Sequence, residues 1–296
     1  PSKFGVSEHP CFCLLPRWWR TGSSHTQMVT VGFPTEGASA DSRDAGQCIA
    51  FEPMADEVRR LRSIEIVHLT KRYGSGPYSK LAVDDLSLSM ASEQITCVLG
   101  HNGAGKTTTL SVLTGLYPPT TGDCYVFGYS ITRARRVVYN MLGICPQHDV
   151  LWPVLTVQEH LELYATLKGV PSKHARVAAR AMAAEVGIPE KVHVRAHALS
   201  GGMKRKLSVG CALIGGSKAV LLDEPSSGMD PSSRRSMWEL LKRSKPGRVL
   251  VLTTHYMDEA DLLADRIAVM NLGKLQCCGS SLFLKSRFGL GYTLSM

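Results

Sequence analysis

Residues 94–107 read QITCVLGHNGAGKT, and this stretch decides the fold. Its last eight residues match Gly-x-x-x-x-Gly-Lys-Thr, in which loop amides surround phosphate oxygens while the lysine and threonine reach the terminal phosphates and Mg²⁺. Residues 94–99 predict a buried strand, and residues 106–114 predict a helix that ends at Gly115. Strand, loop and helix are the setting that a phosphate loop requires. The residues of this loop expected to bind ATP are Gly100, Asn102, Gly103, Gly105, Lys106, Thr107 and Thr108, with Thr107 also reaching Mg²⁺.

A second anion site is indicated by residues 199–203, which read LSGGM. We expect Ser200 to cap a helix, while Gly201 and Gly202 leave amides open at its first turn, where the helix dipole favours an anion. An ordinary helix cap is the alternative. One ATP does not need both sites on one protomer. The economical interpretation therefore places each nucleotide between the loop of one domain and the serine-glycine turn of another.

Two carboxylates end the apolar run of residues 219–224, AVLLDE. This pattern predicts a buried parallel strand that delivers them at its carboxyl end. We expect Asp223 to hold Mg²⁺ and Glu224 to polarise the attacking water. A pair of surface acids is the alternative, but Pro225 and residues 226–230 (SSGMD) predict a turn where a contact between subunits is needed.

A histidine follows the next predicted strand, over residues 249–253. A lone histidine is usually a satisfied polar group. Because His255 comes directly after a core strand and beyond the acidic pair, we expect it to contact the γ-phosphate.

These motifs resemble the nucleotide-binding domain of ABC transporters, and the resemblance runs through nearly all of residues 64–296. It implies that Tyr73, in KRYG, stacks on adenine, with an edge-strand aromatic as the alternative. It implies that Gln147, in CPQH, senses the γ-phosphate and Mg²⁺ and couples to the membrane domain, with a surface loop residue as the alternative. Asp230 looks like the aspartate of the loop that crosses the dimer interface, and residues 200–202 look like the signature that caps the partner's ATP.

Several phrases look most like the first nucleotide-binding domain of subfamily A transporters. Met203 stands where the wider superfamily usually has glutamine, a substitution familiar in that subfamily. The other phrases are HNGAGKTTT at 101–109, LTGLYPP at 113–119 and GSSLFLK at 279–285. Since members of the subfamily are mostly exporters or flippases of lipids, the resemblance implies lipid movement.

The expected fold is α/β, a P-loop NTPase core with a parallel sheet, an antiparallel β layer over residues 64–98 and a helical signature subdomain at about 150–212. Thr156 and Glu159 predict a capping box for a helix over 157–168, and further helices are expected over 172–185 and 232–243. We expect residues 63–296 to form the nucleotide-binding domain and residues 1–62 to be an irregular linker that follows a membrane domain, with a short basic helix over 57–62.

The charge of the chain is unevenly distributed. Basic and acidic residues balance within residues 1–62, so the net charge of +9 belongs to residues 63–296. No aromatic-interleaved Arg/Lys stripe appears, so we expect no nucleic acid partner. Attraction to ATP and to an anionic cytoplasmic leaflet is the simpler account.

No apolar run approaches the ~18 residues that a membrane span needs. If the chain powers transport, the translocation path lies in other parts of the parent protein or in another subunit. The resemblance implies as partners transmembrane domains, most simply in the same parent polypeptide, and a second nucleotide-binding domain, at the cytoplasmic face of a membrane. Phe12, Trp18 and Trp19 indicate either a membrane-interface stretch or packing of the linker on the domain. The nine cysteines include no Cys-x-x-Cys pair and are expected to be reduced packing residues.

Two other functions stay open from sequence. One is a soluble ABC ATPase that acts on ribosomes or DNA, although such proteins usually join two nucleotide domains or insert a long coiled coil. The other is a regulatory module that holds ATP without hydrolysing it, against which the presence of Glu224 and His255 argues.

Overall fold

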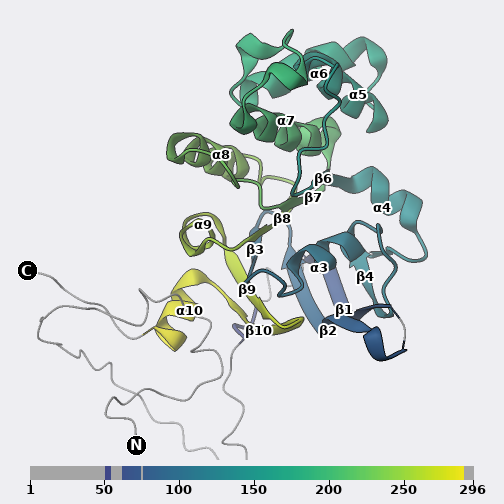
Figure 1. The fold of residues 1–296 in the computed structure, drawn as a ribbon, viewed down its shortest axis with the longest axis vertical. Coiled ribbons are helices and arrows are strands. Elements are labelled where there is room, and N and C mark those ends of the chain that lie inside the picture. Colours follow the sequence, from purple (N-terminus) through teal and green to yellow (C-terminus); the bar gives the residue numbers. More distant parts are fainter. Residues whose placement is uncertain (1–50, 55–61, 75, 290–296) are drawn as a thin grey trace, which may run out of the picture.

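A six-stranded sheet forms the centre of the molecule (Figure 1). The computed structural model describes residues 51–54, 62–74 and 76–289. The strand order is β10-β9-β3-β8-β7-β6, with all neighbours parallel except β10, which pairs antiparallel with β9. In chain order the strands are β3 (Ile95–Leu99), β6 (Leu142–Cys145), β7 (Ala219–Asp223), β8 (Val249–Thr254), β9 (Arg266–Asn271) and β10 (Lys274–Gly279).

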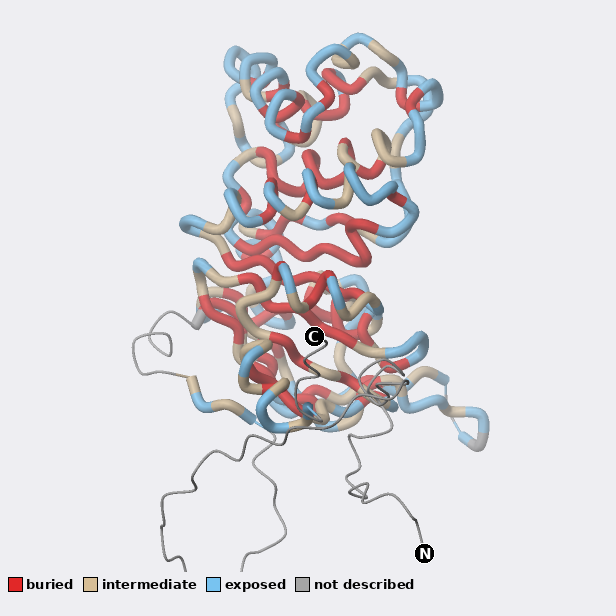
Figure 2. The backbone as a smooth tube through the Cα atoms, turned by 90° about the vertical axis from the view of Figure 1, so that its left-hand side faces the viewer, coloured by how far each residue is buried: buried red, intermediate tan, exposed pale blue. Residues whose placement is uncertain are grey.

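The central strands β3, β7 and β8 are buried on both faces, which explains why they are mainly apolar (Figure 2). Successive side chains point to opposite faces. In β7, Val220 and Leu222 belong to one hydrophobic cluster, and Ala219 and Leu221 belong to the other. The sheet thus separates two cores, and the strands predicted over 94–99, 219–224 and 249–253 are confirmed with shifts of one residue at most.

An antiparallel layer and two helices cover one face. The strand order of this antiparallel layer is β2-β1-β4-β5. The backbone of Asp84 in β2 donates to Gly273 O (2.9 Å), which joins the layer to the central sheet. The antiparallel layer expected from residues 64–98 is confirmed, with β4 and β5 added to it. Its elements are β1 (Arg62–Tyr73), β2 (Lys80–Ala91), β4 (Thr121–Val126) and β5 (Tyr129–Ser130), with α3 (Lys106–Leu113) and α4 (Arg135–Met141).

Three helices extend from the other face as an arm (Figure 1). They are α5 (Val157–Leu167), α6 (Ser172–Glu185) and α7 (Gly201–Leu213). The predicted capping box is present, because Thr156 accepts from the Glu159 amide and the Glu159 carboxylate accepts from the Thr156 amide (2.7 Å). Ser200 caps α7 through a bond from Met203 N to its hydroxyl (3.4 Å). The predicted helical region is therefore observed.

The remaining helices flank the same face. They are α8 (Pro231–Arg243), α9 (Met257–Leu263) and α10 (Ser281–Phe288). Glu52 is bound beside the edge strand β10: its amide donates to Cys278 O (2.8 Å), and its carboxylate accepts from the Ser280 hydroxyl (3.1 Å) at the start of α10. A helix was expected over residues 57–62, of which the structure describes Arg62. The prediction was wrong at this residue, because Arg62 begins β1 and pairs with Ala91. The remaining linker predictions, including Phe12, Trp18 and Trp19, lie outside the described residues.

The cysteines of the described residues are core residues. All six are buried, and burial raises the pKa of Cys124 and Cys145 to about 12, so these thiols are neutral near pH 7. Cys11, Cys13 and Cys48 lie outside the described part. A search of the described helices for one long and apolar enough to span a bilayer finds none.

A glycine in β6 permits the close approach of α7. A Cβ on Gly143 would lie 1.9 Å from Ala212 O of that helix, so Gly143→Ala must push the two elements apart. We expect it to lower the free energy of unfolding by about 1–3 kcal/mol or more, measured by urea titration. Gly202→Ala is the matched control, because nothing lies within 4 Å of its added Cβ and alanine favours the helix by about 0.5–1 kcal/mol. Equal effects of the two changes would contradict this account.

Candidate functional site

Four of the predicted site segments lie at the carboxyl edge of the parallel strands. The phosphate loop (residues 100–107) follows β3, Gln147 follows β6, Glu224 follows β7 and His255 follows β8. These four strands are neighbours in the order β3-β8-β7-β6, so the segments that follow them share one edge. This edge is where open α/β sheets bind ligands.

The phosphate loop has a conformation that glycine makes possible. Gly105 has φ 103°, and a Cβ there would lie 2.6 Å from Ala82 O of β2. The loop closes on the Lys106 ammonium, which donates to Gly100 O (2.8 Å) and His101 O (3.1 Å). Burial lowers the pKa of Lys106 from its ordinary value, while the nearby carboxylates of Glu224 and Asp223 act in the opposite direction. The lysine thus lies in the electrostatic field of the acidic pair.

Glu224 occupies a strained position that neighbouring strands support. Its φ of 48° is uncommon for a residue other than glycine. Its amide donates to Thr253 O (3.2 Å) and Thr253 Oγ1 (3.1 Å), while the Thr253 hydroxyl donates to Asp223. Thr253 of β8 therefore holds both carboxylate residues, a role that the sequence analysis did not assign.

The Glu224 carboxylate has a polar residue near each oxygen. His255 Nδ1 lies 3.0 Å from Oε1, a hydrogen bond when Nδ1 carries the proton. Gln147 Nε2 donates to Oε2 at 3.5 Å. The structure thus brings together Gln147, Asp223, Glu224 and His255. The Lys106 ammonium interacts electrostatically with the carboxylates of the acidic pair.

The residues at this edge fit Mg²⁺. Asp223 supplies a carboxylate, Thr107 a hydroxyl and Gln147 an amide oxygen, which are the hard oxygen donors that Mg²⁺ prefers. In the described part of the chain, no group of three or more His, Cys, Asp or Glu residues could form a complete metal cage. One or two carboxylates completed by substrate phosphates are the usual Mg²⁺ arrangement.

Arg205 is a further residue that the sequence analysis did not assign. It lies on α7, is 3% exposed, and donates to backbone carbonyls of two separate segments, among them Glu224 O (2.7 Å) and Gln147 O (3.2 Å). The helical period could have indicated its burial, because Arg205 shares a face with Val209 and Ala212, both buried.

Two tyrosines lie at the end of β1. The Tyr73 and Tyr117 rings are perpendicular, with centroids 5.6 Å apart. Lys71 Nζ lies 5.0 Å from the Tyr73 centroid and donates to Pro118 O (2.8 Å). Tyr117 and Lys71 thus fix the ring of Tyr73, which keeps partial exposure and can stack on a flat ligand.

Two predicted segments do not join this cluster. No hydrogen bond links residues 200–202 to residues 100–108, all of which the structure describes, and Figure 1 shows α7 in the arm and α3 on the other side of the sheet. Asp230 caps α8 by accepting from Ser233 N (2.9 Å). Bonds from the Ser232 hydroxyl and then the Ser233 amide hold the pKa of Asp230 well below its usual range, so it is charged at neutral pH.

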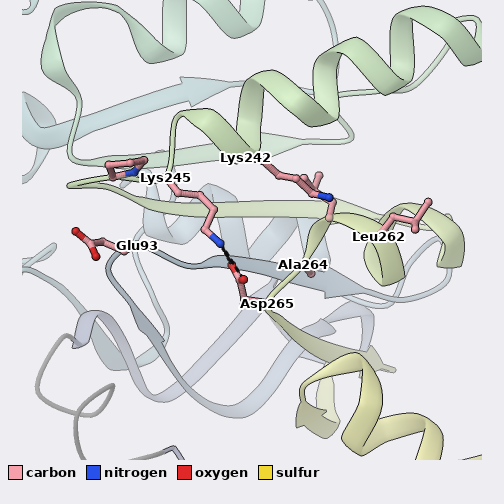
Figure 3. Close-up of a pocket in the computed structure, with 8 residues that line it drawn as sticks. Glu93, Lys242, Lys245, Leu262, Ala264 and Asp265 are labelled. Atoms are coloured by element: carbon pink, nitrogen blue, oxygen red, sulfur yellow. Dashed lines mark hydrogen bonds and ion pairs between the residues drawn. The ribbon is translucent and has the colours of Figure 1, made fainter.

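An open pocket of about 510 Å³ lies at the opposite, amino-terminal edge of the sheet (Figure 3). The Lys245 ammonium forms an ion pair with the Asp265 carboxylate (2.8 Å) across it, and Asp265 also accepts from Ile95 N (2.8 Å), the first residue of β3. These contacts join the start of the sheet to the segment that follows α8. The pocket is therefore separate from the cluster around Glu224.

Comparison with known sequences identifies relatives. The sequence model of the ABC transporter family matches residues 83–227. A Mus musculus protein described as phospholipid-transporting ATPase ABCA3 is 48% identical over 296 residues, 100% of this chain and 17% of that protein. ABC transporter A family member 2 of Dictyostelium discoideum is 51% identical over 233 residues, 79% of this chain and 14% of that protein. The chain thus spans less than a fifth of the length of these curated relatives.

Solved structures share the fold. The ATP binding subunit of an ABC transporter superposes with a TM-score of 0.70 at 24% identity, covering 77% of this chain and 94% of that chain. A dimeric post-hydrolysis state of the ATP-binding cassette MJ0796, bound to ADP and Pi, gives a TM-score of 0.69 at 22% identity, with 74% and 98% covered. The expected α/β P-loop architecture is confirmed.

The hydroxyl of Thr253 supports the site, and its removal tests that role. Thr253→Val keeps the shape but leaves the buried Asp223 oxygen without its donor, so we expect a loss of about 1–3 kcal/mol in the free energy of unfolding, measured by urea titration. Thr96→Val in the adjacent β3 is the control, because that hydroxyl is buried without a partner and its removal is expected to be neutral or stabilising. A loss of the same size in both variants would refute the role of Thr253.

Proposed function

The chain belongs to the ABC transporter family, and on that premise we propose that it is a nucleotide-binding domain that binds and hydrolyses ATP to drive membrane transport. The observation that carries the proposal is the Glu224 carboxylate, held within 3.0 Å of His255 Nδ1 and 3.5 Å of Gln147 Nε2 at the edge where the phosphate loop ends. A carboxylate so placed, beside a lysine that can pair with phosphate, is what ATP hydrolysis requires.

The proposed mechanism assigns a role to each residue of the cluster. The loop amides and Lys106 bind the β- and γ-phosphates, with Lys106 exchanging its bonds to Gly100 O and His101 O for phosphate oxygens. Glu224 accepts a proton from the attacking water. His255 orients Glu224 and contacts the γ-phosphate. Mg²⁺ held by Thr107, Asp223 and Gln147 would neutralise charge that develops on the transferred phosphoryl group.

We propose that Tyr73 stacks on adenine. The perpendicular Tyr117 and the ammonium of Lys71 hold its ring in place. Stacking on an aromatic face is tolerant of the base, so most of the specificity for a triphosphate is expected to come from the phosphate loop.

The separation of residues 200–202 from the phosphate loop supports a shared site. We propose that the capped start of α7 binds the ATP held by a second nucleotide-binding domain, and that Asp230 lies at the contact between the two domains. Two basic domains repel each other without nucleotide, since residues 63–296 carry the net charge of +9. ATP with its negative charge then joins the two faces, and phosphate release lets them part.

The relatives support a role in transport. ABCA3 is described as a phospholipid-transporting ATPase, and this chain corresponds to 17% of it. We propose that residues 63–296 serve a subfamily A transporter of lipids at the cytoplasmic face of a membrane, that residues 1–62 link them to a preceding membrane domain, and that the membrane domains belong to the same polypeptide.

Two substitutions separate the roles of binding and hydrolysis. We expect Glu224→Gln to keep ATP affinity and to lose about 10²- to 10⁴-fold in kcat, as the removal of a general base does. We expect Lys106→Ala to lose ATP binding, measured with a fluorescent ATP analogue. Glu239→Gln, the same change on an exposed face of α8, is the control for both assays. Mild and equal effects of Glu224→Gln and Lys106→Ala would contradict the roles assigned to these two residues. ATP binding without turnover in the wild type would favour a regulatory module.

The shared site predicts a dependence on protein concentration. ATPase turnover per molecule of the full chain should rise with its concentration, and light scattering should detect a Glu224→Gln dimer that ATP traps and nucleotide-free buffer does not. Turnover that is independent of concentration, or dimers that form without nucleotide, would argue against a site completed by a second copy.

A further inference from the structure

We propose that Arg205 is a positioning residue that fixes Glu224 and Gln147 relative to each other and joins both to the helix that begins at the signature turn (residues 200–202). The inference rests on the proposed ATPase function. It concerns a residue that touches neither nucleotide nor metal in that proposal, and acts through the backbone of residues that do.

The first half of the contact is with the end of β7. One terminal nitrogen of the Arg205 guanidinium donates to Glu224 O (2.7 Å) and also to Asp223 O, while Nε donates to Pro225 O (3.1 Å). Three consecutive carbonyls around the acidic pair therefore point at one side chain. Glu224 has φ 48°, and its amide is held by Thr253 and its carbonyl by Arg205. A strained conformation persists when both sides of the residue are held in this way.

The second half is with the Gln147 loop (residues 146–149). The other terminal nitrogen donates to Pro146 O (2.6 Å), Gln147 O (3.2 Å) and the Asp149 carboxylate (3.3 Å). Ser208, one turn further along α7, donates its hydroxyl to the same carboxylate (3.1 Å). Asp149 is thus bound twice by α7. The loop that carries Gln147 is therefore expected to move together with α7.

The chemistry of the side chain explains why an arginine serves here. A guanidinium has five N–H donors in a planar fork, and both terminal nitrogens and Nε of Arg205 are engaged at once. A buried charge is costly unless it is paired and fully hydrogen-bonded, and the carbonyls together with Asp149 meet that condition. Lysine would keep the charge but could not reach two separate segments from one point.

The arrangement couples two parts of the proposed site. Arg205 lies one helical turn after the signature turn, so a displacement of α7 moves its guanidinium against the carbonyls of Glu224 and Gln147. When the start of α7 engages an ATP from a second domain, the positions of the water-activating carboxylate and of the phosphate-sensing amide respond. Because coupling is reciprocal, the same contacts let the state of the Glu224 site alter the affinity of the signature turn.

The test uses the full chain with Arg205→Gln and Arg205→Lys. Lys206→Gln is the matched control, since it removes the same charge from the same helix, and Lys206 extends toward Gly187 rather than the site. The measurements are kcat and KM for ATP, affinity for a fluorescent ATP analogue, and hydrogen exchange of residues 146–149 and 223–225. We expect Arg205→Gln to lower kcat about a hundredfold with unchanged nucleotide affinity, as a small misplacement of catalytic groups does, and to speed exchange in those two segments only. The kcat and the exchange rates of Arg205→Lys should lie between those of Arg205→Gln and those of the wild type.

Several outcomes would overturn the proposal. A kcat and exchange rates in Arg205→Gln equal to those of the wild type would overturn it. A joint loss of nucleotide affinity, kcat and exchange protection over the whole chain would also overturn it, because that result indicates a purely structural residue. If Arg205→Gln does not fold, Asp149→Ala removes one anchor, and exchange in residues 146–149 must still rise. A wild type without ATPase activity contradicts the proposed function alone, because the exchange measurement still decides whether Arg205 holds the two segments.

Discussion

The candidate site is organised around the left-handed backbone conformation of Glu224. A non-glycine residue at φ 48° at the end of a buried strand needs support from its surroundings. That support comes from Thr253 of β8 on one side and Arg205 of α7 on the other. The side chain is thereby directed between His255 and Gln147, which themselves follow neighbouring strands. The backbone and side chain of this one residue thus contact a strand, a helix and two loops.

The two buried faces of the sheet determine what surrounds this residue. Helix α3 and the antiparallel layer pack on one face, whereas α5, α6 and α7 belong to the core on the other. The phosphate loop and the signature turn are therefore held by different cores and do not meet within the chain. This separation is consistent with the proposed site that two domains complete, and in that proposal the contacts of α7 with the Glu224 edge connect the two cores.

Much of the fold could be predicted because its elements carry local signals. The strand at residues 95–99 and the helix at 172–185 follow from uninterrupted apolar or amphipathic runs, and the capping box at Thr156 marks a helix start by side-chain chemistry alone. The expected helix over residues 57–62 fails at Arg62, where pairing with Ala91 across the antiparallel layer outweighs local propensity. Strand pairing is a long-range interaction, which a local pattern does not contain.

The phosphate loop, the acidic pair and the order of the segments that carry Gln147 and His255 could be predicted from the amino-acid sequence, because loop glycines and strand-end carboxylates depend on local backbone chemistry. Folding was needed to reveal which oxygen of Glu224 each neighbour contacts, that Thr253 supports both carboxylates, and that Arg205 bonds to carbonyls of residues 146–147 and 223–225. Backbone carbonyls have no side-chain identity in the sequence. The partners of a buried guanidinium that binds them are therefore revealed only when the chain has folded around it.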